Sequence, residues 1–98
     1  MAVKLALLAL LEAKPGKGPQ LGAFLERGRD IAVREQDTVT WYAFKIDETH
    51  YGIFDTFETD DARNAHLAGE IARALGKVAP DLLATEPDMR TVDIVAVK

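Results

Sequence analysis

Apolar residues occupy both alternating positions of the first long segment of this chain. Residues 5–11 read Leu-Ala-Leu-Leu-Ala-Leu-Leu, and Pro15 and Gly16 end the segment. No polar stripe recurs at helical spacing, so we interpret Ala2 to Ala13 as a strand. Because successive side chains of a strand point to opposite faces, a strand that is apolar at both alternations needs burial on both faces of its sheet.

A helix and a β-hairpin are predicted next along the chain. Pro19 suits the first turn of a helix, and apolar residues at three-to-four spacing continue to about Glu35. Residues 38–46 and 51–57 are rich in β-branched and aromatic side chains, which favour strands. The polar turn between these two strands contains His50, which we expect to be exposed to solvent.

A second helical segment and a last strand complete the pattern. Thr59 precedes two aspartates, which is typical of an N-cap, and the helical pattern continues to about Leu83, with Gly69 and Gly76 as points of division. The apolar residues at 92–97 predict the closing strand after a turn at 86–88.

The resulting order, βαββαβ, predicts a ferredoxin-like α+β fold with a four-stranded antiparallel sheet that carries its helices on one face. A chain of 98 residues is long enough for one compact core, so residues 1–98 form a single domain. Its two helical segments cover only one sheet face. We therefore predict that the other face meets a second copy of the chain in a homodimer.

Composition excludes several classes of function. The chain has no cysteine and only two histidines, which leaves no basis for a disulfide, a thiolate metal site or an imidazole metal cluster. Its net charge of −4 provides no basic surface for nucleic acid. The apolar run that follows Lys4 is far shorter than the roughly 20 residues of a membrane span and lacks a cleavage site. We therefore expect a cytoplasmic protein without a metal ion, a membrane or a nucleic acid as partner.

Six short motifs, in the predicted order of elements, resemble the antibiotic biosynthesis monooxygenase family of dimeric α+β barrels, and the resemblance extends over nearly the whole chain. They are Lys14-Pro15-Gly16-Lys17, Arg34-Glu35, Trp41-Tyr42-Ala43, the segment from Tyr51 to Phe57, Ala65-His66-Leu67 and Asp81-Leu82-Leu83. The resemblance implies a ferredoxin-like protomer, two of which join their sheets into one barrel.

The same resemblance implies a cofactor-free monooxygenase that oxidises a small quinol or polyphenol with dioxygen. The haem-degrading branch of the family needs an asparagine in the first strand, then a tryptophan and a histidine on the helix after the third strand. Here the first strand has no asparagine, His66 aligns with that tryptophan, and Gly76 aligns with that histidine. Haem is therefore not the expected ligand.

Four residues are candidates for the site. His66 is the candidate catalytic base, because an imidazole accepts a proton near neutral pH, and its small helical neighbours predict a cavity beside it. Trp41 and Phe54 are candidate walls for a flat aromatic ligand. Asp55 interrupts an apolar strand and therefore needs a partner, either His66 or a basic residue such as Arg34.

Two other classes of function fit the same residues. One is a barrel that binds a small molecule without chemistry, and the other is an isomerase or lyase that uses His66 alone for proton transfer. An enclosed cavity beside His66, with a second polar group directed into it, would favour the catalytic alternatives.

Overall fold

The computed structural model describes residues 3–98, so Ala2, the first residue of the predicted opening strand, lies outside the described part. The elements, in chain order, are β1 (Leu5–Glu12), α1 (Gly18–Ala32), β2 (Thr40–Lys45), β3 (His50–Phe57), α2 (Asp60–Leu67), α3 (Glu70–Leu82) and β4 (Asp88–Asp93). All strand pairs are antiparallel, and the strands lie in the order β2-β3-β1-β4. The predicted ferredoxin-like α+β fold is therefore confirmed.

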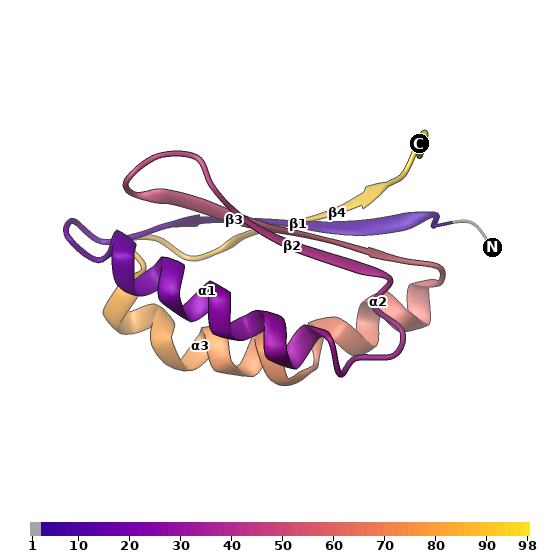
Figure 1. Ribbon diagram of the computed structural model, residues 1–98, viewed down its shortest axis with the longest axis horizontal. Coiled ribbons are helices and arrows are strands. Elements are labelled where there is room, and N and C mark those ends of the chain that lie inside the picture. Colours follow the sequence, from indigo (N-terminus) through magenta and orange to yellow (C-terminus); the bar gives the residue numbers. More distant parts are fainter. Residues whose placement is uncertain (1–2) are drawn as a thin grey trace.

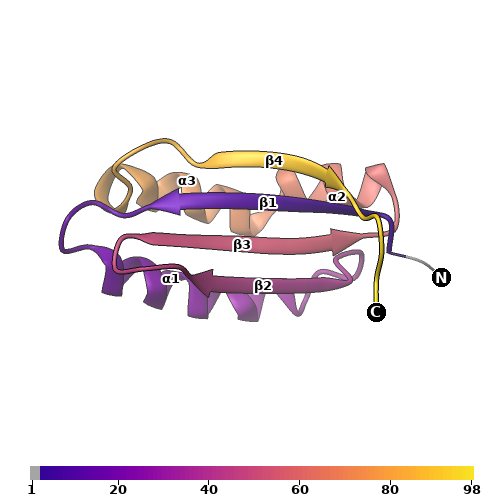
Figure 2. The same ribbon diagram turned by 90° about the horizontal axis from the view of Figure 1, so that it is seen from above.

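The three helices lie on one side of the sheet, and no helix of the described residues covers the other side (Figures 1 and 2). Odd-numbered residues of β1 and β3 point toward the helices and form the core with residues of α1 and α3. This core comprises Ala9, Leu11, Ala13, Leu21, Leu25, Tyr51, Ile53, Leu75 and Leu83. Even-numbered residues of the same strands point to the open face.

The ends of the helices follow local signals in the sequence. Pro19 stands in the first turn of α1, which ends at Ala32, three residues before the predicted end. Thr59 caps α2 as predicted, because its hydroxyl accepts a hydrogen bond of 3.1 Å from the amide of Ala62. The second helical segment divides at Gly69, which is the N-cap of α3, whereas Gly76 lies inside α3.

The position of the last strand differs from the prediction. β4 covers Asp88–Asp93, while the apolar residues at 94–97 lie beyond its end. Leu5, the first residue of β1, pairs with Asp93, and the amide of Ile94 still donates to the carbonyl of Lys4. Leu5 is the first residue of β1, so no further residue of β1 remains to pair with the chain after Ile94. Residues 94–98 instead turn across the end of the sheet on the side away from the helices (Figures 1 and 2).

The open face of the sheet carries apolar side chains. Leu8, Leu10, Phe44 and Phe54 are half-buried on this face, and Tyr42 is exposed beside them. In the segment after β4, Val95 is 98% exposed. Both faces of the sheet are therefore apolar, as the alternation of the first strand predicted, although the homodimer itself stays a prediction.

Replacement of Thr59 by alanine tests the cap of α2. We expect Thr59→Ala to lower the free energy of unfolding by about 1 kcal/mol, because the first turn loses its side-chain acceptor. Urea denaturation measures this change. Thr85→Ala, an exposed loop threonine, serves as the matched control, and equal effects of the two substitutions would contradict the assigned cap.

Candidate functional site

His66 of α2 lies between two carboxylates from other parts of the chain. Its Nε2 is 2.8 Å from Oδ2 of Asp55 on β3, and its Nδ1 is 2.6 Å from Oε1 of Glu35, which follows α1. The side chains of His66, Asp55 and Glu35 are 9%, 2% and 22% exposed. The centroids of the Phe57 ring and the His66 imidazole are 5.3 Å apart. The Thr38 hydroxyl donates a hydrogen bond of 2.9 Å to Oε1 of Glu35.

The two carboxylates favour the protonated form of the ring. Burial lowers the pKa of His66, but the hydrogen bond and charge of Asp55, followed by those of Glu35, raise it more, and the pKa lies above the ordinary 6.5. As an imidazolium, His66 directs both N–H groups at carboxylates. No ring nitrogen is then free to take a proton from a substrate.

The cavity predicted beside His66 is small. Its volume is about 30 Å³, enough for a single water molecule. It lies between the sheet and the helices α2 and α3. Its lining is Leu7, Ala9, Ile53, Asp55, His66, Leu67, Ile71, Ala72, Leu75 and Met89. A quinol does not fit this space.

The structure selects between the two partners that the sequence offered for Asp55. Asp55 pairs with His66, whereas Arg34 lies 3.6 Å from Glu70 on the surface. Arg63, on the same helix as His66, also reaches the sheet. Its guanidinium is largely buried and donates to the carbonyls of Ala6 and Val92, both at 3.4 Å.

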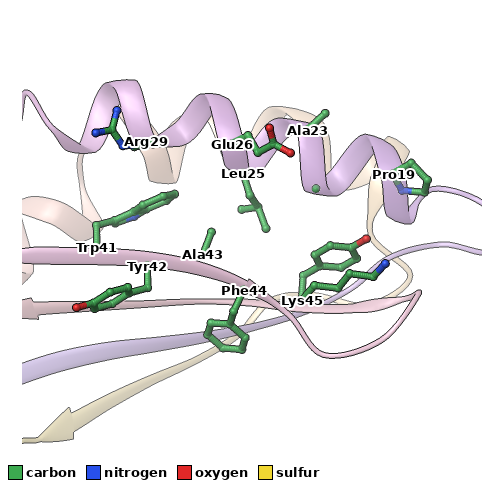
Figure 3. A pocket seen from close by; sticks show the side chains of 12 residues that line it. Pro19, Ala23, Leu25, Glu26, Arg29, Trp41, Tyr42, Ala43, Phe44 and Lys45 are labelled. Atoms are coloured by element: carbon green, nitrogen blue, oxygen red, sulfur yellow. The ribbon is translucent and has the colours of Figure 1, made fainter.

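A larger groove of about 760 Å³ lies between α1 and β2, at the edge of the sheet. Trp41 and Ala43 point toward α1 in Figure 3, and Leu25 reaches down from the helix beside Ala43, on the side away from Trp41. The full lining is Pro19, Gly22, Ala23, Leu25, Glu26, Arg29, Trp41, Tyr42, Ala43, Phe44, Lys45 and Tyr51. The groove is long enough and apolar enough for a flat aromatic molecule.

Two glycines of α1 face the aromatic walls of this groove. A Cβ at Gly28 would lie 3.4 Å from the Trp41 ring, and a Cβ at Gly22 would lie 3.4 Å from the Tyr51 ring. Ala43, between the two rings, is too small to fill the space. A Cβ at either glycine would be in ordinary van der Waals contact with its ring, so the small side chain that leaves the space open is Ala43.

The four predicted site residues fall into two groups. Trp41, Asp55 and His66 lie on the helix side of the sheet, and Trp41 is the direct cross-strand neighbour of Asp55. Phe54 pairs with Leu8 and Tyr42, so it lies on the open face, away from the other three. Sequence reasoning missed the contact of Glu35 with His66, because no local pattern links residues that are 31 positions apart.

Other site types find no support in the described residues. Residues 3–98 contain no group of three histidine, cysteine or carboxylate side chains placed to hold a metal ion. Within the same range, no helix has the length and apolar character that a membrane crossing requires.

Neither a protein-family model nor a curated protein matches the sequence. Solved structures, in contrast, include proteins with the same fold. The chain is 41% identical to NE2512, a protein of unknown function from Nitrosomonas europaea, with a TM-score of 0.96 over 98% of this chain and 93% of that one.

Two more distant structures carry the name "putative antibiotic biosynthesis monooxygenase". The one from Nitrosomonas europaea has a TM-score of 0.83 at 12% identity, covering 94% of this chain and 99% of that one. The one from Caulobacter crescentus has a TM-score of 0.79 at 18% identity, covering 96% and 92%. The fold predicted from the sequence motifs is therefore the fold of these proteins.

The ionisation of His66 provides a test of the site. We expect NMR titration of the ring protons to give His66 a pKa above 6.5, and Asp55→Asn to lower this pKa. The pKa of His66 is higher in the folded chain than in the unfolded chain, so protonation of His66 stabilises the fold. This contribution to the free energy of unfolding is fully present below the unfolded pKa and is lost as the pH rises through the folded pKa.

His50 is the internal control for this titration. Its pKa is raised mainly by the hydrogen bond to Asp47, so it should stay unchanged in Asp55→Asn. A parent His66 that titrates at or below 6.5 would contradict the assigned ion pairs.

Proposed function

We propose that this chain, which belongs to the same family as NE2512 and has the fold of the antibiotic biosynthesis monooxygenases, binds a small quinol or polyphenol and oxidises it with dioxygen without a cofactor. The observation that carries the proposal is the groove between α1 and β2. Its aromatic walls match the faces of a flat ring, and its charged residues lie where a phenolic oxygen would meet solvent.

Charge at the groove suits an electron-rich ligand. Arg29 and Lys45 are cations among its lining residues, and Glu26 is an anion. The phenol releases its proton to solvent water; the resulting phenolate is attracted by the cations and is a better electron donor to dioxygen than the neutral phenol. With an anthrone as substrate, the ring CH₂ becomes a carbonyl. One atom of dioxygen ends in that carbonyl and the other in water, so no further reductant is needed.

His66 has an indirect role in this proposal. Both of its nitrogens face carboxylates, and the cavity beside it has room for only one water molecule. We therefore place His66 as a positioning residue that holds the Asp55 side chain in one orientation through their 2.8 Å contact. An isomerase or lyase that depends on a free His66 nitrogen is less compatible with this geometry.

A second candidate function is binding of the same aromatic molecule without chemistry. The doubly paired His66 favours this alternative, because the described residues then offer no free imidazole to take the proton. Binding and oxidation use the same groove, so a measurement of oxygen consumption separates the two functions.

Oxygen uptake by metal-stripped protein tests the oxidation. We expect uptake with a panel of hydroquinones and anthrones, and a decrease of about tenfold or more in Ala43→Leu, whose larger side chain fills the space between Trp41 and Tyr51. Ala68→Leu, an exposed residue at the end of α2, is the matched control and should keep the parent rate. Aromatic binding without uptake would leave the binding function and exclude the oxidation of these compounds.

We further propose that the open sheet face joins two copies of the chain. Half-buried Leu8, Leu10, Phe44 and Phe54 form an apolar surface that no helix of residues 3–98 covers. An identical surface on a second copy is the simplest way to remove this area from water.

Light scattering at micromolar concentration tests the homodimer. We expect the mass of a dimer for the parent and of a monomer for Phe54→Lys, which places a charge at the centre of the apolar surface. Val33→Lys is the control, because Val33 is 64% exposed at the end of α1, on the helix side. A monomeric parent would refute the dimer.

A further inference from the structure

Two buried polar atoms have no hydrogen-bond partner within residues 3–98. They are the indole nitrogen Nε1 of Trp41 and the carboxylate oxygen Oδ1 of Asp55. A buried polar atom without a partner costs free energy, and folded proteins leave few of them. Two such atoms in one small region therefore need an explanation.

The two atoms belong to neighbouring side chains with complementary roles. Trp41 and Asp55 are direct partners across β2 and β3, on the helix side of the sheet. Side chains in this relation have their Cβ atoms about 4.5–5.5 Å apart. The indole N–H only donates, and the carboxylate oxygen only accepts. A single hydroxyl group satisfies both, because its oxygen accepts and its hydrogen donates.

The surroundings hold both groups in place. Oδ2 of Asp55 is fixed at 2.8 Å from the His66 ring, which leaves Oδ1 as the unused acceptor. The Trp41 ring packs on Gly28, and the same ring forms a wall of the groove between α1 and β2. Trp41 thus lines the groove (Figure 3) and is also the cross-strand neighbour of Asp55.

We propose that Trp41 Nε1 and Asp55 Oδ1 form a receptor for one hydroxyl group of an aromatic ligand seated in the groove. The ligand class is a flat phenol. The ring lies against Trp41, and its hydroxyl passes the half-buried edge of the indole, accepts from Nε1 and donates to Oδ1. This inference rests on the proposed binding function and names the group that is recognised.

The receptor also gives a functional role to the ion pairs of His66 with Asp55 and Glu35. A charged acceptor binds a hydroxyl more strongly than a neutral one does, and the His66 ring holds the Asp55 carboxylate in its buried position through Oδ2. In this arrangement Asp55 contacts the ligand, and His66 with Glu35 acts through Asp55.

Calorimetry with β-naphthol and its methyl ether tests the receptor. The two probes share the same rings, but the ether cannot donate a hydrogen bond. We expect the parent to bind β-naphthol at least about tenfold more tightly than the ether, as a hydrogen bond to a charged group requires. The preference should fall to a few-fold at most in Asp55→Asn and in Trp41→Phe.

Controls separate this inference from the proposed function. Asp61→Asn, an exposed aspartate of α2, should keep the parent preference. Trp41→Phe keeps an aromatic wall and leaves the His66 network intact, so it tests the receptor even where Asp55→Asn does not fold. Equal binding of both probes by the parent would overturn the receptor and leave the aromatic groove. Failure to bind either probe would overturn both.

Discussion

Asp55 is a carboxylate inside an otherwise apolar core, and its position depends on the ion pair with His66. Burial of a lone charge is strongly unfavourable, so Asp55 needs the imidazolium of His66, and Glu35 pairs with the other nitrogen of the same ring. The three side chains come from β3, α2 and the segment after α1. The same interaction that balances a buried charge therefore ties α2 to β3 and to the segment between α1 and β2.

This network also determines what kind of site the fold can offer. Because both nitrogens of His66 are engaged and the adjacent cavity has room for only one water molecule, the proposed ligand site is the groove between α1 and β2. The cross-strand pair Trp41 and Asp55 connects the two regions. In the proposed receptor, the hydroxyl of an aromatic molecule in the groove reaches Asp55 past Trp41, and a carboxylate is a strong acceptor for a hydroxyl.

Several elements were predictable from local patterns. The N-cap at Thr59, the hairpin around His50 and the helix after Pro19 follow from residue type and spacing, which act within a few positions. The last strand was misplaced, because apolar character pointed to residues 92–97, whereas pairing with β1 ends at Asp93. Strand limits depend on the length of the neighbouring strand, and no local pattern contains that information.

The sequence by itself determined the ferredoxin-like topology, the apolar character of both sheet faces and the need of Asp55 for a partner. These follow from alternation, capping and the cost of burying a charge, all of which are properties of single residues or short segments. Only the tertiary structure decided that this partner is His66 rather than Arg34 and that Glu35 completes the network. It also placed Phe54 on the face opposite Trp41. Contacts between residues distant in the chain depend on how helices pack on the sheet, which is set by the whole core at once.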